Sequence, residues 1–113
     1  MYYRYIVNMS DPQKMSYTAA VVLQTIHAGY SYGFDIMEVA GLPSGTVYPA
    51  LRRLEQQQLI KSKWETESTA FADQRPARKY YQLTQLGKDA LTKARQRYRL
   101  LEQLAMTESP KHR

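Results

Sequence analysis

Residues 44–55 read Ser-Gly-Thr-Val-Tyr-Pro-Ala-Leu-Arg-Arg-Leu-Glu, and they carry the clearest structural signal of the chain. Val47, Leu51 and Leu54 recur at positions i, i+4 and i+7, which predicts a helix with one apolar face. Small residues let a helix approach a surface closely, and arginines can pair with phosphates or with guanine edges. Such a helix suits the DNA major groove, although two arginines also occur on ordinary solvated helices. The face opposite the apolar one carries Gly45, Pro49, Arg52 and Gln56, flanked by Tyr48 and Arg53.

The composition indicates one small, basic domain without cysteine. The 113 residues are 43% hydrophobic, enough for a modest core that a partner subunit would help to cover. The net charge of +6 favours an anionic partner, nucleic acid first and an acidic membrane surface second. The absence of cysteine excludes disulfides and thiolate metal sites. No apolar run approaches the ~20 residues of a membrane span, and residues 1–7 are too short and too polar for a signal sequence, so we expect a cytoplasmic protein.

Two more helices are expected before residue 44. Ser16 is the expected N-cap of the first, which ends near Gly29. The second covers residues 33–40 and ends at the glycine that follows. We expect Ser44 to cap the third helix, and its start to be distorted or late because Pro49 lacks an amide hydrogen and crowds the carbonyl four residues earlier. The expected core positions of the first two helices are Ala19, Val22, Leu23, Ile26, Phe34, Ile36 and Val39.

A hairpin of two strands is expected next. Residues 59–65 alternate apolar and polar side chains, as a half-buried strand does, and residues 80–83 are a second candidate strand. The intervening residues 66–77 are polar and predict a loop, with Arg75 and Arg78 near its far end. The economical interpretation is a β-hairpin with a long basic tip, which is the wing of a winged helix-turn-helix.

A long helix, capped by Thr84 and reaching about residue 106, is expected to close a fold that is mainly α with a small β wing. The expected parts are an N-terminal extension (1–14), a winged helix-turn-helix DNA-binding domain (15–83), a dimerisation helix (84–106) and a disordered tail (107–113). The apolar seam of the last helix consists of Leu86, Ala90, Leu91, Ala94, Tyr98, Leu101 and Ala105. The seam residues expected to contact a second subunit are Leu91, Ala94, Tyr98, Leu101 and Ala105.

Four blocks follow one another in the chain: Ser16-Tyr-Thr-Ala-Ala-Val-Val-Leu23, Tyr32-Gly-Phe-Asp-Ile36, residues 44–55 with Leu59-Ile60, and Arg75-Pro-Ala-Arg-Lys-Tyr-Tyr-Gln-Leu-Thr84. Together they resemble the PadR family of bacterial transcriptional regulators, over roughly residues 15–105. The resemblance implies a homodimeric repressor with a winged helix-turn-helix and a dimer built by C-terminal helices. A single short C-terminal helix resembles the smaller subfamily. Known members control phenolic-acid stress genes, multidrug pumps and, in cyanobacteria, clock genes.

Two positions depart from the family pattern. Ala19 stands where an acidic residue is usual, which weakens the cap of the first helix. Asp73-Gln74 stand where members often have glycine, which predicts a stiffer wing tip.

The candidate DNA contacts lie on the third helix, the strands and the wing. At least one of Arg52 and Arg53 is expected to contact DNA, while Tyr48 either contacts a phosphate or packs at the edge of the core. Trp64 either lines a ligand cavity at the dimer centre or, as we favour, belongs to the core. No catalytic triad, metal-ligand motif or phosphate loop is recognisable, so we expect no enzyme, metal or cofactor. The expected DNA contacts are Ser44, Gly45, Thr46, Tyr48, Pro49, Arg52, Arg53, Lys61, Lys63, Arg75, Arg78 and Lys79.

Three functions are consistent with these features. The leading one is a homodimeric repressor that occludes a promoter on double-stranded DNA, with two recognition helices about 34 Å apart. The second is a one-component sensor, in which a planar aromatic ligand at the dimer interface releases the DNA. The third is a protein-interaction adapter, against which the seven cations between residues 52 and 79 argue.

Overall fold

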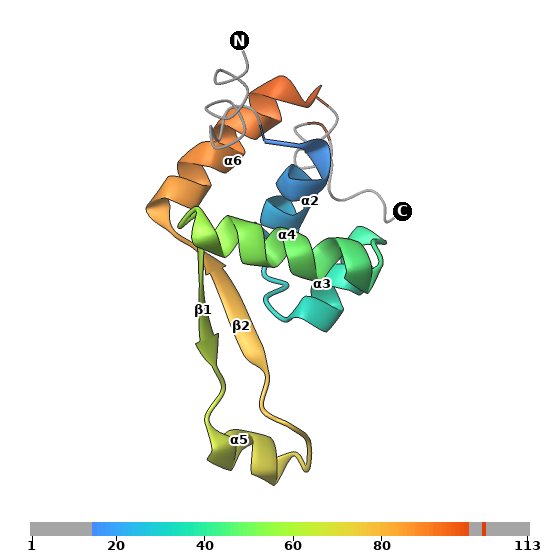
Figure 1. The fold of residues 1–113 in the computed structure, drawn as a ribbon, viewed down its shortest axis with the longest axis vertical. Coiled ribbons are helices and arrows are strands. Elements are labelled where there is room, and N and C mark those ends of the chain that lie inside the picture. Colours follow the sequence, from blue (N-terminus) through green and yellow to red (C-terminus); the bar gives the residue numbers. More distant parts are fainter. Residues whose placement is uncertain (1–14, 100–102, 104–113) are drawn as a thin grey trace.

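The computed structural model describes residues 15–99 and Gln103. Figure 1 shows a helical body from which a two-stranded antiparallel hairpin projects, with a short helix at the far end of the hairpin. This is a winged helix-turn-helix, as the sequence predicts. The expectations for residues 1–14, for Leu101 and Ala105, and for the tail lie outside the described residues. The elements are α2 (Tyr17–His27), α3 (Gly33–Ala40), α4 (Ser44–Gln56), β1 (Ile60–Trp64), α5 (Glu67–Ala72), β2 (Lys79–Leu83) and α6 (Gln85–Arg97).

Local signals define several helix ends, and the predictions at Ser16, Gly41 and Thr84 are confirmed. The Ser16 hydroxyl accepts a hydrogen bond from the Ala19 amide at 3.1 Å, and the Thr84 hydroxyl accepts one from the Gly87 amide at 3.0 Å. Such caps satisfy amides that have no partner inside the helix. α3 ends at Gly41, whose φ of 70° lies in the left-handed region that glycine adopts without strain.

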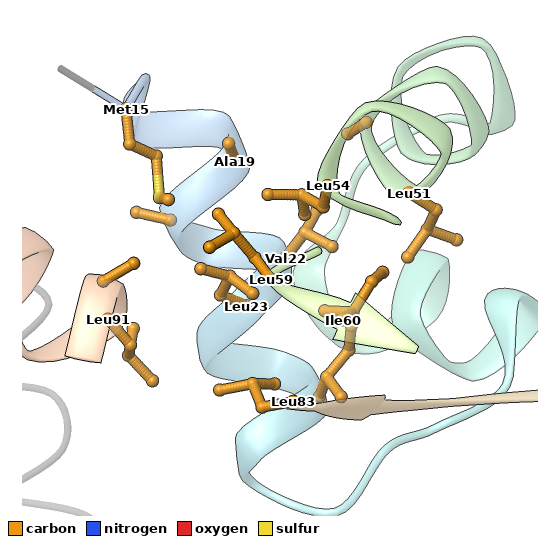
Figure 2. Close-up of a cluster of buried hydrophobic side chains, with 14 of the residues drawn as sticks. Met15, Ala19, Val22, Leu23, Leu51, Leu54, Leu59, Ile60, Leu83 and Leu91 are labelled. Atoms are coloured by element: carbon orange, nitrogen blue, oxygen red, sulfur yellow. The ribbon is translucent and has the colours of Figure 1, made fainter. Parts of the chain in front are cut away.

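The core surrounds α2, from which Val22 and Leu23 are completely buried (Figure 2). Leu51 and Leu54 of α4 cover one side of α2, and Leu91 of α6 covers another. Fully burying one leucine side chain stabilises a fold by about 1.5–3 kcal/mol, so this cluster holds the helices and the base of the hairpin together.

The expected core of α3 is wrong at two of its three positions. Ile36 is fully buried, but Phe34 is 61% exposed and Val39 is 52% exposed. An eight-residue helix packs only one narrow face against its neighbours, and in α3 that face contains Gly33 and Ile36. Phe34 and Val39 lie outside this face and meet solvent.

The last helix is interrupted earlier than expected. α6 ends at Arg97, and Tyr98 has extended backbone, so a single helix from residue 84 to residue 106 is not correct. The Tyr98 hydroxyl donates a hydrogen bond to the Met15 carbonyl at 2.8 Å, and its ring meets that of Tyr17 edge to face at 5.3 Å. Tyr98 therefore ties the end of α6 to the start of α2.

The burial of α6 also changes the expected dimer surface. Leu91 and Ala94 are only 2% and 3% exposed, because both pack in the core. Their side chains have no free surface to offer a second subunit, which corrects their assignment to a dimer interface. Leu86, expected to be shielded by the three-helix head, is instead 50% exposed.

The hairpin has the expected strands but not the expected loop. β1 and β2 pair antiparallel, with Ile60 opposite Leu83 and Trp64 opposite Lys79. Residues 66–77, predicted to be a loop, contain helix α5, because the Thr66 hydroxyl accepts a hydrogen bond from the Thr69 amide and Ala70 is buried.

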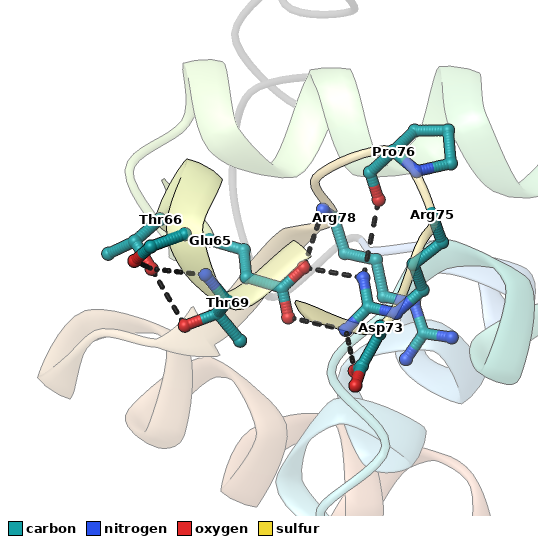
Figure 3. A network of polar contacts seen from close by, with 8 residues as sticks. Glu65, Thr66, Thr69, Asp73, Arg75, Pro76 and Arg78 are labelled. Atoms are coloured by element: carbon teal, nitrogen blue, oxygen red, sulfur yellow. Dashed lines mark hydrogen bonds and ion pairs between the residues drawn. The ribbon is translucent and has the colours of Figure 1, made fainter. Parts of the chain in front are cut away.

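An ion pair closes the base of this inserted helix (Figure 3). The two carboxylate oxygens of Glu65 accept hydrogen bonds from the Arg75 guanidinium at 2.5 and 2.8 Å, and one of them also accepts from the Arg78 amide at 3.1 Å. The Glu65 side chain is only 3% exposed. The hydrogen bond from Arg75 is the main cause that lowers the pKa of Glu65 from its ordinary 4.5 to about 2, against the opposing effect of desolvation.

The first prediction concerns this pair. A carboxylate whose pKa falls on folding stabilises the folded state above its unfolded pKa, and this contribution is lost as the pH falls from 4.5 towards 2. Hydrogen exchange of the Arg78 amide should therefore accelerate across that range relative to the Leu23 amide in the core. In the Glu65→Gln variant, the backbone amide of Arg78 should be less protected from exchange already at neutral pH. Equal protection in both proteins at neutral pH would show that the pair does not hold the wing.

The second prediction concerns Gly87, where α6 crosses the end of α4. A Cβ atom at this position would overlap the carbonyl oxygen of Leu59. Alanine is normally the better helix former by about 1 kcal/mol, but here we expect Gly87→Ala to lower the free energy of unfolding by about 1–3 kcal/mol. Urea denaturation measures this change. Gly45→Ala is the matched control, because a Cβ at Gly45 meets nothing within 4 Å and stability should not fall.

Candidate nucleic-acid interface

The helix α4 buries one face and exposes the other. Val47, Leu51 and Leu54 are at most 2% exposed, whereas Gly45, Arg52, Arg53 and Gln56 are exposed. The apolar periodicity at residues 44–55 therefore predicted the orientation of this helix correctly.

The start of α4 differs from the expectation. Pro43 occupies the N-cap position, and the amides of Thr46 and Val47 donate to its carbonyl at 2.9 and 3.0 Å. Ser44 is thus the first helical residue and not the cap. The helix therefore begins one residue earlier than a cap at Ser44 would set, and not later, and it continues through Pro49.

The guanidinium groups of the two arginines of α4 have no partner among the described residues. Neither the Arg52 nor the Arg53 side chain forms a hydrogen bond or an ion pair with another described residue. Both guanidinium groups therefore keep their donors for an external acceptor. Consecutive helical positions differ by about 100°, so the two side chains leave the helix in different directions.

Tyr48 packs at the edge of the core and is still 42% exposed. Its ring lies against Gly33, where a Cβ atom would come within 2.6 Å of the Tyr48 hydroxyl oxygen. A side chain at position 33 would therefore displace the Tyr48 ring from this contact between α3 and α4.

The strand lysines lie apart from the arginines of α4. The Ser62 hydroxyl donates to the Glu55 carboxylate at 2.5 Å, so the sheet face that contains Ser62 is turned towards α4. Side chains alternate along a strand, and Lys61 and Lys63 therefore occupy the opposite face, with their pairing partners Gln82 and Tyr80. The structure does not bring these two lysines together with Arg52 and Arg53.

Two aromatic rings connect the wing to the helical body. Tyr32, before α3, forms an isolated bridge with Tyr80, and their ring centroids are 4.9 Å apart. The Arg78 guanidinium lies 4.7 Å from the centroid of the Tyr32 ring. Arg78 is exposed, so this stack orients its charge towards solvent. No local sequence pattern predicts the pairing of Tyr32 with Tyr80, since the two residues are distant in the chain.

The outer end of the wing is not basic. Residues 65–74 contain three acids and no lysine or arginine. The Arg75 guanidinium forms ion pairs with the carboxylate of Glu65 and, at 3.2 Å, with that of Asp73. α5 presents Phe71, which is 84% exposed. The wing cations that have no ion pair among the described residues are therefore nearer its base, at Lys61, Lys63, Arg78 and Lys79.

Trp64 is 62% exposed, so the expectation that it belongs to the core is wrong. It stands at the end of β1 that is farthest from the core, and the Lys79 ammonium lies 5.7 Å from the centroid of its ring. This position is on the wing and not beside α6.

Two features are absent from the residues that the structure describes. Within residues 15–99 and Gln103, no helix is long and apolar enough to span a membrane. The same residues contain no group of three histidine, cysteine or acidic side chains arranged to hold a metal ion.

Comparisons with known proteins agree with this geometry. The model of the PadR-like family of transcriptional regulators matches residues 22–93. A PadR family transcription regulator from hypervirulent Clostridium difficile R20291 has a similar crystal structure, with a TM-score of 0.65 and 31% identity, over 79% of this chain and 94% of that one. A transcriptional regulator from Clostridium thermocellum is similar in fold, with a TM-score of 0.61 and 23% identity, over 84% of this chain and 91% of that one. No curated protein showed significant similarity.

The matched residues are more than half of the chain and include α3, α4 and both strands of the wing. The family consists of transcriptional regulators and not of enzymes. The chain therefore belongs to the PadR-like family of DNA-binding transcriptional regulators.

Proposed function

We propose that the protein is a cytoplasmic, homodimeric repressor that occludes a promoter by inserting α4 of each subunit into the major groove of its operator. The observation that carries this proposal is the outer face of α4, where Arg52 and Arg53 are exposed and have no partner in the described part of the chain. Free guanidinium groups on a helix with a small residue at its start suit close approach to DNA.

The two arginines have different tasks in this proposal. Because they diverge by about 100° around the helix, one can point into the groove while the other meets the phosphate backbone. In the first turn of α4, the amides of Ser44 and Gly45 and the hydroxyls of Ser44 and Thr46 are offered to a phosphate at the positive end of the helix dipole. Pro49 and Tyr48 complete the approaching surface.

Arg78 and Lys79 add backbone contacts from the wing. The stack on Tyr32 holds the planar guanidinium of Arg78 in one orientation, so less side-chain entropy is lost when it pairs with a phosphate. The contact role expected for Arg75 is reassigned in this proposal, because Glu65 already occupies both ends of its guanidinium. Arg75 keeps the wing in shape.

The third prediction tests α4. Arg52→Ala and Arg53→Ala should each weaken operator binding by about 1–3 kcal/mol if the arginine reads a base, with relaxed preference at one operator position. An arginine that contacts phosphate should instead lower affinity for all sequences and reduce the salt slope by about one. Fluorescence anisotropy at several salt concentrations separates the two cases.

Lys93→Ala is the control for this measurement. Lys93 is exposed on α6 and outside the proposed surface, so the same loss of one positive charge should leave the affinity nearly unchanged. If the Arg52 and Arg53 variants both bind like the Lys93 variant, α4 does not read the operator.

Dimerisation is proposed through the segment that follows Tyr98. The buried positions of Leu91 and Ala94 leave this segment, with Leu101 and Ala105 of the sequence seam, as the interface we favour. The half-buried Tyr98 and the adjacent Tyr17, which is 41% exposed, offer aromatic surface at the described end of α6. A two-fold pair uses one surface twice and would set two copies of α4 on half-sites about 34 Å apart.

The fourth prediction tests this assembly. Wild-type protein should sediment at about twice the chain mass of 13.2 kDa. Leu101→Glu should sediment as a monomer, because a carboxylate in the interface has no partner charge, and operator binding should weaken as one α4 captures half a site. Leu86→Glu alters a half-exposed leucine of α6 that lies outside the proposed interface, and this variant should remain dimeric. A wild-type monomer at micromolar concentration would contradict the paired half-sites.

A further inference from the structure

A groove of about 850 Å³ lies between the wing and the helical body. Its walls come from the outer sheet face, from the end of α2 with the loop that follows, and from the first turn of α6. Ile26 and Leu83, which are almost fully buried, supply an apolar base. The volume lies in the range of about 300–1,000 Å³ that is typical of small-molecule sites.

The charge of this groove is of one sign. Lys61 and Lys63 enter from β1, Lys88 from α6, and His27 from the end of α2, whereas no aspartate or glutamate lines it. Within the described part of the chain, the ammonium groups of the three lysines form neither a hydrogen bond nor an ion pair. The nearest acid in sequence, Asp89, accepts a hydrogen bond from the Gln85 side chain at 3.1 Å. The positive charge of the groove is therefore not compensated internally.

The spacing of the lysines favours a ligand with more than one anionic group. Lys61 and Lys63 are two residues apart on one strand face, which separates their Cα atoms by about 6.6 Å. Lys88 stands on a different element across the groove, so a single small anion does not satisfy all three ammonium groups at once. The Ser31, Gln82 and Tyr80 residues of the lining add polar atoms between them.

The cationic part of the groove is separate from the face of α4. Ser62 and Tyr81, which also line the groove, belong to the sheet face that meets α4, where the Ser62 hydroxyl donates to Glu55. The lysines lie on the other face of the same two strands. A duplex that rests on Arg52 and Arg53 is thus on the far side of the sheet from the groove, which favours a ligand distinct from the operator.

We propose that this groove binds a small polyanion, a molecule that carries two or more phosphate or carboxylate groups. The ligand would bridge the wing, through Lys61 and Lys63, and the helical body, through Lys88 and His27. Such a bridge would add to the contacts that the Tyr32–Tyr80 pair and the buried ends of the strands already make between hairpin and body. This proposal does not depend on the one made above for α4.

Calorimetry on the full chain tests the proposal, with pyrophosphate and citrate as separate probes for the two kinds of anionic group. Wild-type protein should bind at least one of them at millimolar concentration. The double variant Lys61→Gln/Lys63→Gln should bind about tenfold more weakly, since two exposed charge contacts are lost. Lys88→Gln, on another element, should weaken the same probe.

Two variants serve as matched controls. Lys93→Gln removes one positive charge from α6 outside the groove, and Arg52→Ala removes one from α4, so both should bind the probe as the wild type does. All these side chains are exposed, and thermal unfolding checks that each variant is folded. Absence of binding by both probes, or equal binding by the wild type and the double variant, would overturn the proposal.

Operator binding by the double variant gives a second readout. Unchanged operator affinity and salt slope support a site for small ligands that is separate from the DNA surface. A salt slope reduced by about two, together with displacement of DNA by pyrophosphate, would identify the groove as part of the DNA surface and overturn the proposal.

Discussion

The burial of α2 is the constraint on which the other elements depend. α2 touches α3, α4, α6 and β2, and Val22 and Leu23 have no exposed surface. α4 can cover this helix only with its face of Val47, Leu51 and Leu54, so Arg52 and Arg53 must point outward. The reading face is thus a consequence of core packing, and a change in the core of α4 would rotate the surface offered to DNA.

The positive charge is divided by the geometry of the hairpin. The chain has a net charge of +6, which by itself suggests one broad cationic surface. Because side chains alternate along β1, Lys61 and Lys63 instead lie on the sheet face opposite α4. The charge of Arg75 is paired with the acids Glu65 and Asp73. Net charge therefore indicates the class of partner, and the strand register determines where that partner can bind.

The sequence predicted what local chemistry determines. The caps at Ser16, Gly41 and Thr84 depend on residues at most four positions away, and all three are correct. Helix α5 was not predicted, because its ends are held by Glu65 and Arg75, ten residues apart, and a short polar helix has no periodicity that distinguishes it from a loop. The exposure of Phe34 and the break at Tyr98 depend on tertiary contacts that no local pattern encodes. The sequence could not show that the candidate DNA contacts lie on two different sheet faces, because this depends on the pairing register of β1 with β2.

The exposed position of Trp64 makes the protein a source of its own optical signal. It is the single tryptophan of the chain, and it lies on the hairpin beside the Lys79 ammonium, outside the core. When tryptophan is excited selectively, the indole emission therefore arises from the hairpin alone, without background from the helices. Any ligand or duplex that dehydrates this segment changes the emission maximum, so the state of the hairpin can be followed without an attached dye.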